Sequence, residues 1–166
     1  MLQVGSQVVN GIHGVCSIIE VETRRIDRKN VEYFVLEPND QPGARFYVPV
    51  NNQIALSKLR NLLTKEELDQ LLASEAVYQN CWIGDENRRK QKYRELINTA
   101  DPAELIAMIL VLNQHKENQL AAGRKFHLSD DNFLRDAQKI LSSEFSYVLN
   151  IPRGEVAAYI EAKLHK

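Results

Sequence analysis

The chain has 166 residues, of which 44% are hydrophobic and 26% are charged, and its formal net charge is −1. This is enough apolar material for one ordinary domain or two small ones. The near-neutral charge argues against a protein that bulk charge alone holds to nucleic acid, so any contact with DNA has to come from a local basic cluster.

Nothing in the sequence predicts export or membrane insertion. Met1-Leu2-Gln3 runs straight into a strand pattern without a signal peptide, and no apolar run approaches the ~18 residues that span a bilayer. The two cysteines, Cys16 and Cys81, have no CxxC spacing and make no disulfide framework. We therefore expect a cytoplasmic protein in a reducing compartment.

Before residue 60 the periodicity is that of short strands. β-branched and aromatic residues gather near positions 8–9, 15–21, 31–36 and 46–48. Turn-forming residues separate these runs, beginning with Asn10-Gly11 and His13-Gly14. This pattern predicts a small, strongly curved sheet or barrel over residues 1–58, with at least one edge left available.

After residue 60 the pattern becomes helical. Thr64 and Glu67 have the spacing of a capping box, Asp101-Pro102 is a strong helix start, and Ser129 is a candidate cap for a further helix. Apolar stripes predict four or five helices, which form a compact all-helical bundle over residues 62–166. The expected fold class is α+β.

Two basic spots lie in the helical part. The denser one covers residues 88–94, where Arg88 and Lys92 are one helical turn apart, and the other is Arg124-Lys125 between two helices. Two such spots could follow a phosphate backbone without reading bases. The alternative is a solvated helix face, which is what charge runs usually are.

Trp82 is the only tryptophan and lies just before the basic helix. An apolar wedge beside cations is how minor-groove proteins open or kink a base step. The alternative is a packed anchor in the core or between domains, the commoner fate of a lone tryptophan. Both interpretations stay open at the level of sequence.

The strand module carries polar residues suited to a partner. Arg45 and Tyr47 alternate, so they point to the same side of one strand, and Arg24 lies near the end of an earlier strand. Such residues beside an open edge suit β-augmentation by a partner strand. The alternative is charge that only protects a soluble edge from aggregation.

Catalytic and metal-binding signals are weak. The sequence has no G-x-S-x-G, P-loop or paired-carboxylate signature. The spacing of His13, Cys16, Cys81 and His115 fits no usual zinc pattern. We therefore expect a protein that is not an enzyme and that uses no metal, cofactor or small-molecule ligand.

Several stretches occur in the order typical of one family. The first half contains Val4-Gly5-Ser6-Gln7-Val8-Val9, His13-Gly14, Glu32-Tyr33-Phe34-Val35-Leu36, Val48-Pro49-Val50-Asn51 and Leu59-Arg60. The second half contains Trp82, Arg88-Arg89, Thr99-Ala100-Asp101, Ala122-Gly123-Arg124-Lys125 and Asp136-Ala137-Gln138-Lys139-Ile140-Leu141. Over nearly its whole length the chain resembles the CarD/CdnL family of bacterial transcription regulators.

The resemblance implies two surfaces. The first is a Tudor-like β-module, shared with transcription-repair coupling factor, that docks on the RNA polymerase β subunit. The second is a helical domain that contacts double-stranded promoter DNA at the upstream edge of the melted bubble, where a tryptophan enters the minor groove and stabilises the open complex.

The resemblance also implies roles for individual residues. Arg24 and Tyr47 fall at positions that face polymerase, and strand geometry adds Arg45. Trp82 corresponds to the wedge. The implied contacts to the DNA backbone are Arg88, Arg89, Lys92, Arg124 and Lys125.

Two other interpretations compete with this one. A polymerase-tethered protein–protein adaptor would keep the first surface and make little direct contact with DNA. A ribosome-associated protein is the third possibility, because residues 4–22 also resemble a KOW-type strand pattern, although the low net charge counts against ribosomal RNA. An enzyme comes last. We expect a bacterial cytoplasmic regulator, associated with the nucleoid through polymerase.

Overall fold

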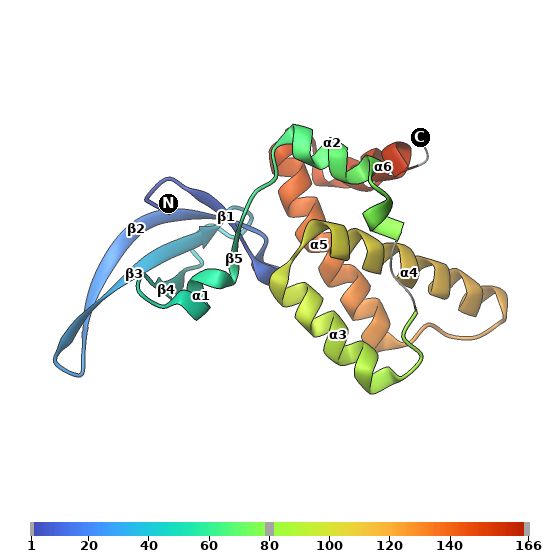
Figure 1. The fold of residues 1–166 in the computed structure, drawn as a ribbon, viewed down its shortest axis with the longest axis horizontal. Coiled ribbons are helices and arrows are strands. Elements are labelled where there is room, and N and C mark those ends of the chain that lie inside the picture. Colours follow the sequence, from blue (N-terminus) through green and yellow to red (C-terminus); the bar gives the residue numbers. More distant parts are fainter. Residues whose placement is uncertain (1, 79–81, 165–166) are drawn as a thin grey trace.

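The computed structural model describes residues 2–78 and 82–164, and its fold is α+β, as predicted. Figure 1 shows a sheet at one end of an elongated molecule and a group of helices at the other. No helix in the described part of the chain is long and apolar enough to span a bilayer.

Five antiparallel strands form one open sheet in the order β4-β3-β2-β1-β5. The strands are β1 (Gln7–Asn10), β2 (Val15–Ile26), β3 (Lys29–Pro38), β4 (Phe46–Pro49) and β5 (Leu59–Asn61). Strands β4 and β5 stand at the two edges and do not pair with each other, so the pairing does not close the sheet into a barrel. The sheet continues through Asn61, past the predicted boundary at residue 58.

Strands β2 and β3 form a long hairpin. Asp27 and Arg28 make its two-residue turn with φ angles of 49° and 66°, the backbone that a tight right-twisted hairpin requires. The pairing of β3 with β4 ends at Tyr33 and Pro49. Beyond that point the hairpin projects from the sheet as a two-stranded ribbon (Figure 1).

The helices are α1 (Gln53–Ser57), α2 (Lys65–Ala73), α3 (Glu86–Thr99), α4 (Pro102–Ala121), α5 (Leu128–Leu149) and α6 (Arg153–Leu164). Short 3-10 turns occupy Gly11–His13 and Glu75–Tyr78. Helix α5 packs against α3, α4 and α6 and also reaches the first 3-10 turn and β2. It is therefore the element that links the helices to the sheet.

The helix starts show which local sequence signals correctly predict the residue at which a helix begins. The Thr64 capping box is present, and the Asp101 side chain accepts from the backbone N–H of Glu104 ahead of Pro102. The prediction for Ser129 was wrong, because α5 begins at Leu128 after His127, which makes no side-chain capping bond. The short helix α1, capped by Asn52, was not predicted.

Strand β1 is buried on both faces. Val8 packs with Cys16 and other residues of the sheet core, whereas the next residue, Val9, packs into the core of the helices together with Val15. Sheet and helices therefore share a continuous apolar contact along β1 and the start of β2.

The close approach of sheet and α5 depends on Gly14. Its φ angle is +69°, and a Cβ there would lie 2.5 Å from Oγ of Ser143 on α5. The same Ser143 hydroxyl accepts a hydrogen bond from the backbone N–H of Val15 at 3.0 Å. Both the left-handed backbone and the missing side chain are thus needed at this position.

A buried carboxylate fixes the second contact between the two parts. Glu144 on α5 is fully buried and accepts two bonds from the Arg60 guanidinium, at 2.9 Å and 2.6 Å. It also accepts from the backbone N–H of Leu63 at 2.9 Å. The bidentate geometry compensates the cost of burying the charge and restricts how β5 can move against α5.

Candidate functional site

Three strands bring an arginine and two tyrosines together beside the edge of the sheet. The Arg24 guanidinium carbon, on β2, lies 4.1 Å from the ring centroid of Tyr47 on β4 and 6.0 Å from that of Tyr33 on β3. The two tyrosine rings meet edge to face at 6.5 Å. We call Glu22, Arg24, Tyr33 and Tyr47 the Arg24 cluster.

Two attractions orient Arg24. Its Nε donates to Glu22 Oε1 at 2.6 Å, and this bond, with a further contribution from Tyr47, raises the pKa of the guanidinium. The ring faces add a cation–π contact. The side chain nevertheless stays 45% exposed, so the arginine is held in one place and still faces solvent.

The other predicted polymerase residue, Arg45, lies just before β4. It forms an ion pair with Glu37 on β3 at 3.9 Å, and its side chain is exposed. Strand alternation predicts that Arg45 and Tyr47 share one side of the strand, but it does not include Tyr33. The signal for Tyr33 was present in the hairpin register, in which it pairs with Glu22, two residues from Arg24.

Strand β4 has a free outer edge. Within the described residues it pairs only with β3, and its last residue is Pro49, which has no N–H to donate. An exposed sheet edge can accept a partner strand, although a short edge strand that ends in proline is also one way to protect an edge from pairing.

The structure corrects the prediction for Arg89. Its side chain is only 4% exposed, and its Nε and Nη2 donate to the two carboxylate oxygens of Asp130 at 2.9 Å and 3.1 Å. Its Nη1 donates to the carbonyl of Ile83 at 3.0 Å. Arg89 cannot contact a phosphate in this arrangement, because the helical register puts it on the buried face with Tyr93.

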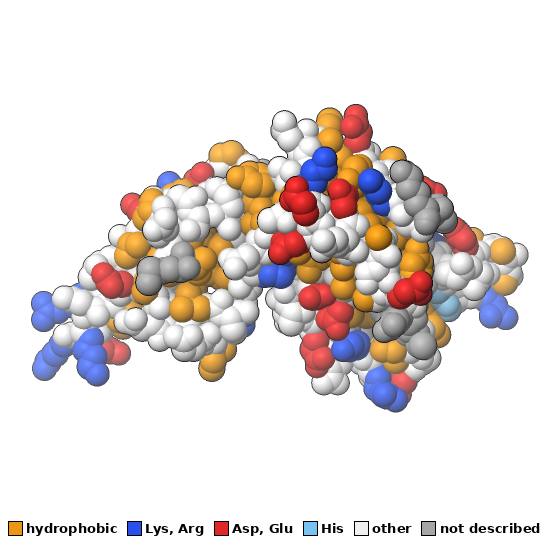
Figure 2. All heavy atoms as spheres, turned by 45° about the horizontal axis from the view of Figure 1, so that its top comes forward, with side chains coloured by type: hydrophobic (Ala, Val, Ile, Leu, Met, Phe, Trp, Pro, Cys, Tyr) orange, Lys and Arg blue, Asp and Glu red, His pale blue; other side chains and the backbone are white. Residues whose placement is uncertain are grey.

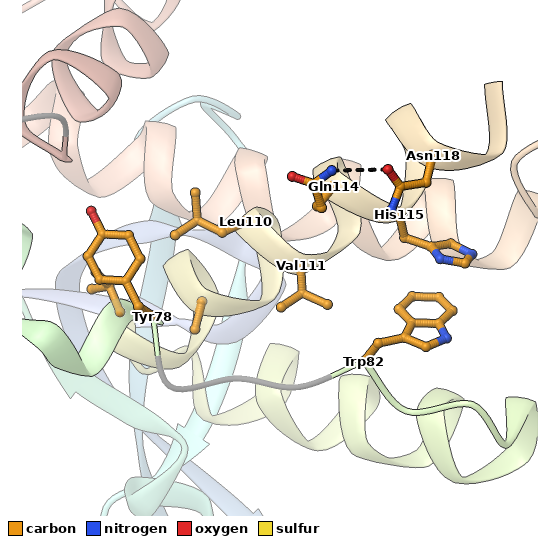
Figure 3. Close-up of a pocket in the computed structure, with 9 residues that line it drawn as sticks. Tyr78, Trp82, Leu110, Val111, Gln114, His115 and Asn118 are labelled. Carbon is orange, nitrogen blue, oxygen red and sulfur yellow. Dashed lines mark hydrogen bonds between the residues drawn. The ribbon is translucent and has the colours of Figure 1, made fainter. Parts of the chain in front are cut away.

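Trp82 packs within the helical part of the molecule. The His115 ring stacks on it at 3.6 Å with an interplanar angle of 14°, and the Arg89 guanidinium carbon lies 4.4 Å from its ring centroid. Figure 3 shows the His115 and Trp82 rings stacked beside a cavity of about 320 Å³. We call Trp82, Arg89, His115 and Asp130 the Arg89 cluster. Trp82 itself is partly buried, and one face of its ring is stacked on His115.

The cavity beside Trp82 is mainly apolar. Val77, Leu110 and Val111 contribute to its wall. At its rim Gln114 Nε2 donates to Asn118 Oδ1 at 3.1 Å (Figure 3). A second hollow of about 700 Å³ lies between α4, α5 and α6.

The remaining predicted DNA contacts are exposed. Arg88 and Lys92 lie on the outer side of α3, and Arg124 and Lys125 lie between α4 and α5. The surface of α3 also carries acid: Glu86 pairs with Lys90 at 3.0 Å, and this bond lowers the pKa of Glu86.

The described members of the candidate metal set, His13, Cys16 and His115, contact different parts of the molecule. The His13 ring contacts the Phe46 ring at 4.0 Å, whereas His115 stacks on Trp82. Cys16 is buried in the sheet, where burial raises the pKa of its thiol to about 12, and Cys81 lies outside the described residues. Among residues 2–78 and 82–164, no group of three or more His, Cys, Asp or Glu side chains could hold a metal ion.

An open antiparallel sheet with a free edge strand and an exposed cationic–aromatic cluster is typical of modules that bind a partner protein at the edge. A family model identifies this module: residues 2–60 match the CarD-like/TRCF RID domain. The match supports a CarD-like/TRCF RID module in the amino-terminal part of this chain, and the RID domain is a polymerase-interacting module. The match ends at Arg60, so the helices from α2 onward lie outside it. No curated protein matches the chain.

Proposed function

We propose that the chain is a bacterial transcription regulator that binds the RNA polymerase β subunit through its sheet and promoter DNA through its helices. The match of residues 2–60 to a polymerase-interacting domain carries this proposal. The finer fold assignment, a Tudor-like module followed by a compact helical bundle, belongs to the same proposal. The proposed role is not enzymatic.

The polymerase surface is the outer edge of β4 with the Arg24 cluster beside it. A strand of the partner adds to β4, and main-chain hydrogen bonds supply the affinity. Arg24 and Tyr47 supply specificity, since both are exposed and Glu22 already fixes the arginine. Because this order exists before binding, little side-chain entropy is lost on docking.

The DNA surface consists of exposed cations on the helices: Arg88, Lys92, Arg124 and Lys125. With a net charge of −1, the chain has little general affinity for a polyanion. Docking on polymerase raises the local concentration of DNA, so a few phosphate contacts are sufficient. In this role the chain stabilises the open complex at the upstream edge of the bubble.

Binding to the β-subunit lobe tests the first surface. Arg24→Glu and Tyr47→Ala should each weaken capture of the lobe by tenfold or more, because each removes part of the exposed cluster. Arg25→Glu is the matched control: it makes the same charge change at the neighbouring exposed residue, on the opposite side of the strand. Unchanged binding in both Arg24→Glu and Tyr47→Ala would overturn the assignment.

A second candidate function is a polymerase-tethered adaptor whose helices bind another protein. The burial of Arg89 and the packing of Trp82 favour it, because Arg89 is paired with Asp130 and one face of the Trp82 ring is stacked on His115. The lifetime of open complexes formed with polymerase and promoter DNA separates the two functions. Lys92→Gln together with Lys125→Gln should shorten that lifetime for a DNA-binding regulator and leave it unchanged for an adaptor.

A further inference from the structure

A groove between α4, α5 and α6 keeps apolar side chains partly open to solvent. Its volume is about 700 Å³, and its lining includes Ile109, Leu110, Leu141, Ile160 and Leu164. All of these except Leu141 are only partly buried at the edge of the helical core. Figure 2 shows hydrophobic side chains at the surface of the helical half, next to acidic ones. We call this hollow the α4–α6 groove.

The groove follows both of its walls. On α6 the lining residues extend from Arg153 to Leu164, which is about 17 Å of helix. On α4 they lie between Ile109 and Glu117. Gly154 keeps the α6 wall low, since a Cβ added there would meet nothing within 4 Å. The groove therefore has room for about three turns of a closely packed helix.

The apolar lining favours a helix over an extended peptide. An extended chain would lay its backbone N–H and C=O groups against Leu110 and Leu141, which offer no side-chain hydrogen bonds. A helix satisfies these groups internally and presents an apolar stripe at positions i, i+3, i+4 and i+7. The amides of Asn113 and Gln138 also line the groove and can contact the polar flank of that stripe.

Carboxylates stand on both walls of the groove. Glu117 on α4 and Glu161 on α6 line it, and both are exposed. Arg153 lines it as well, but its Nη1 forms an ion pair with Asp40, after β3, at 3.3 Å. The charge that these walls offer to a partner is therefore negative.

Two neighbouring lysines are engaged elsewhere. Lys116 on α4 pairs with Asp131 on α5 at 3.3 Å. Lys163 on α6 lies 5.6 Å from the ring centroid of Tyr159. Basic side chains on an incoming helix would therefore meet the two carboxylates without competition from these lysines.

We propose that the α4–α6 groove binds an amphipathic helix of another protein, whose apolar stripe is flanked by lysine or arginine on both sides. A second copy of this chain is a poor occupant, because its basic helix α3 already buries Tyr93, Leu96 and Ile97. The two carboxylates repel phosphate, which disfavours DNA. The inference goes beyond the proposed binding of polymerase and DNA, and it gives the adaptor candidate a defined helical surface.

Two designed helical peptides of about 16 residues are the probes. Both carry leucine at i, i+3, i+4 and i+7, and the stripe is flanked by lysine in one peptide and by glutamate in the other. Fluorescence anisotropy with the full chain should show about tenfold tighter binding of the lysine peptide, with a preference that shrinks as salt is added. Equal affinities, or no binding of the lysine peptide, would overturn the proposal.

Ala157→Lys tests whether the peptide lies in the groove. Ala157 lines the groove and is exposed, so a lysine there should obstruct the peptide and weaken binding about tenfold without unfolding the chain. Ala158→Lys is the matched control, because it makes the same change at the next exposed residue of α6, outside the lining set. Equal losses in the two variants, with unchanged thermal midpoints, would contradict the proposed site.

Reversing the two carboxylates gives a test that does not depend on filling the groove. Glu117→Lys together with Glu161→Lys should make the glutamate peptide the tighter ligand. Glu104→Lys together with Glu155→Lys is the control, since it changes one exposed acid on each of the same helices outside the lining set. A charge-reversed chain that still prefers the lysine peptide would refute the proposal.

Sedimentation of the full chain distinguishes another protein from a second copy. If the wild type self-associates and Ala157→Lys makes it monomeric, a second copy covers the groove and the proposal is overturned. These assays contain neither polymerase nor DNA. Their failure would therefore leave the binding of the β-subunit lobe and the open-complex lifetime as separate measurements, and would remove only the surface assigned to the adaptor candidate.

Discussion

The two parts of the molecule use the same three chemical groups for different purposes. In the Arg24 cluster an arginine donates to a carboxylate at 2.6 Å and lies 4.1 Å from a tyrosine ring. In the Arg89 cluster an arginine donates to a carboxylate at 2.9 Å and lies 4.4 Å from a tryptophan ring. The exposed fractions of the two arginine side chains, 45% and 4%, are what differ.

This difference decides what each cluster can do. An exposed ion pair adds little to stability, so the order it imposes on Arg24 is available to a partner. A buried pair is costly to break, because removing one partner leaves an uncompensated charge, so Arg89 serves the fold. An arginine beside an aromatic residue and an acid therefore indicates a binding site only where the group is exposed.

The largest effect should come from breaking the buried pair. Arg89→Ala leaves the carboxylate of Asp130 buried without its partner and should lower the free energy of unfolding by about 3–5 kcal/mol. Urea unfolding followed by circular dichroism measures the loss. Arg24→Ala is the control: its unfolding midpoint should match the wild type, and equal losses in the two variants would contradict the comparison.

A smaller loss should follow Trp82→Ala. The ring is partly buried and packs against His115 and Arg89, so truncation should cost about 2–3 kcal/mol, at or below the low end for a core tryptophan. The same unfolding measurement checks it. Tyr47→Ala is the control from the Arg24 cluster: it should weaken polymerase binding and leave the unfolding midpoint unchanged. If Trp82→Ala changed the free energy of unfolding by less than ~0.5 kcal/mol, the tryptophan would not be an anchor.

The sequence correctly predicted those structural features that depend on residues close together in the chain. The Thr64 capping box and the Asp101-Pro102 start are local, and both helices begin where these signals stand. The α+β class followed from the change of periodicity near residue 60. The start of α5 was misplaced because Ser129 has capping chemistry but the chain turns into the helix earlier, at His127.

The candidate sites could not be predicted in full from the sequence, because they depend on contacts between residues that are far apart in the chain. Arg89 was assigned to a charged helix face, and only its pairing with Asp130, 41 residues away, shows that it is buried. Tyr33 joins the Arg24 cluster through strand register, which no single run of residues reveals.

The Arg89 cluster contains a histidine, His115, and the Arg24 cluster contains none. Lowering the pH should therefore weaken the Arg89 cluster through protonation of His115. Burial lowers the pKa of His115, Arg89 and His127 lower it further, and Asp130 opposes them. Because the folded state takes up the proton less readily than the unfolded chain, whose value is 6.5, the contribution to stability is complete above pH 6.5 and is lost as pH falls below it.

His115→Phe keeps a ring on Trp82 and removes this titration. Between about pH 7.5 and about pH 5.5 the free energy of unfolding should fall more in the wild type than in the variant. The difference between the two proteins should be smaller than the loss expected for Trp82→Ala. His13, whose pKa burial also lowers, is present in both proteins, so the difference between them isolates His115. Parallel losses in the two proteins would contradict the prediction.

The smallest effect concerns the hydroxyl of Tyr93, one turn beyond Arg89. The ring packs edge to face with Phe133 at 5.7 Å, while the buried hydroxyl has no hydrogen-bond partner within the described residues. Burial raises the pKa of this tyrosine to about 12, so it stays neutral. Tyr93→Phe should therefore change the free energy of unfolding by less than ~0.5 kcal/mol, or raise it, because it removes an unsatisfied polar group and keeps the ring. A loss above ~1 kcal/mol in urea unfolding would contradict the prediction and show that the hydroxyl stabilises the fold.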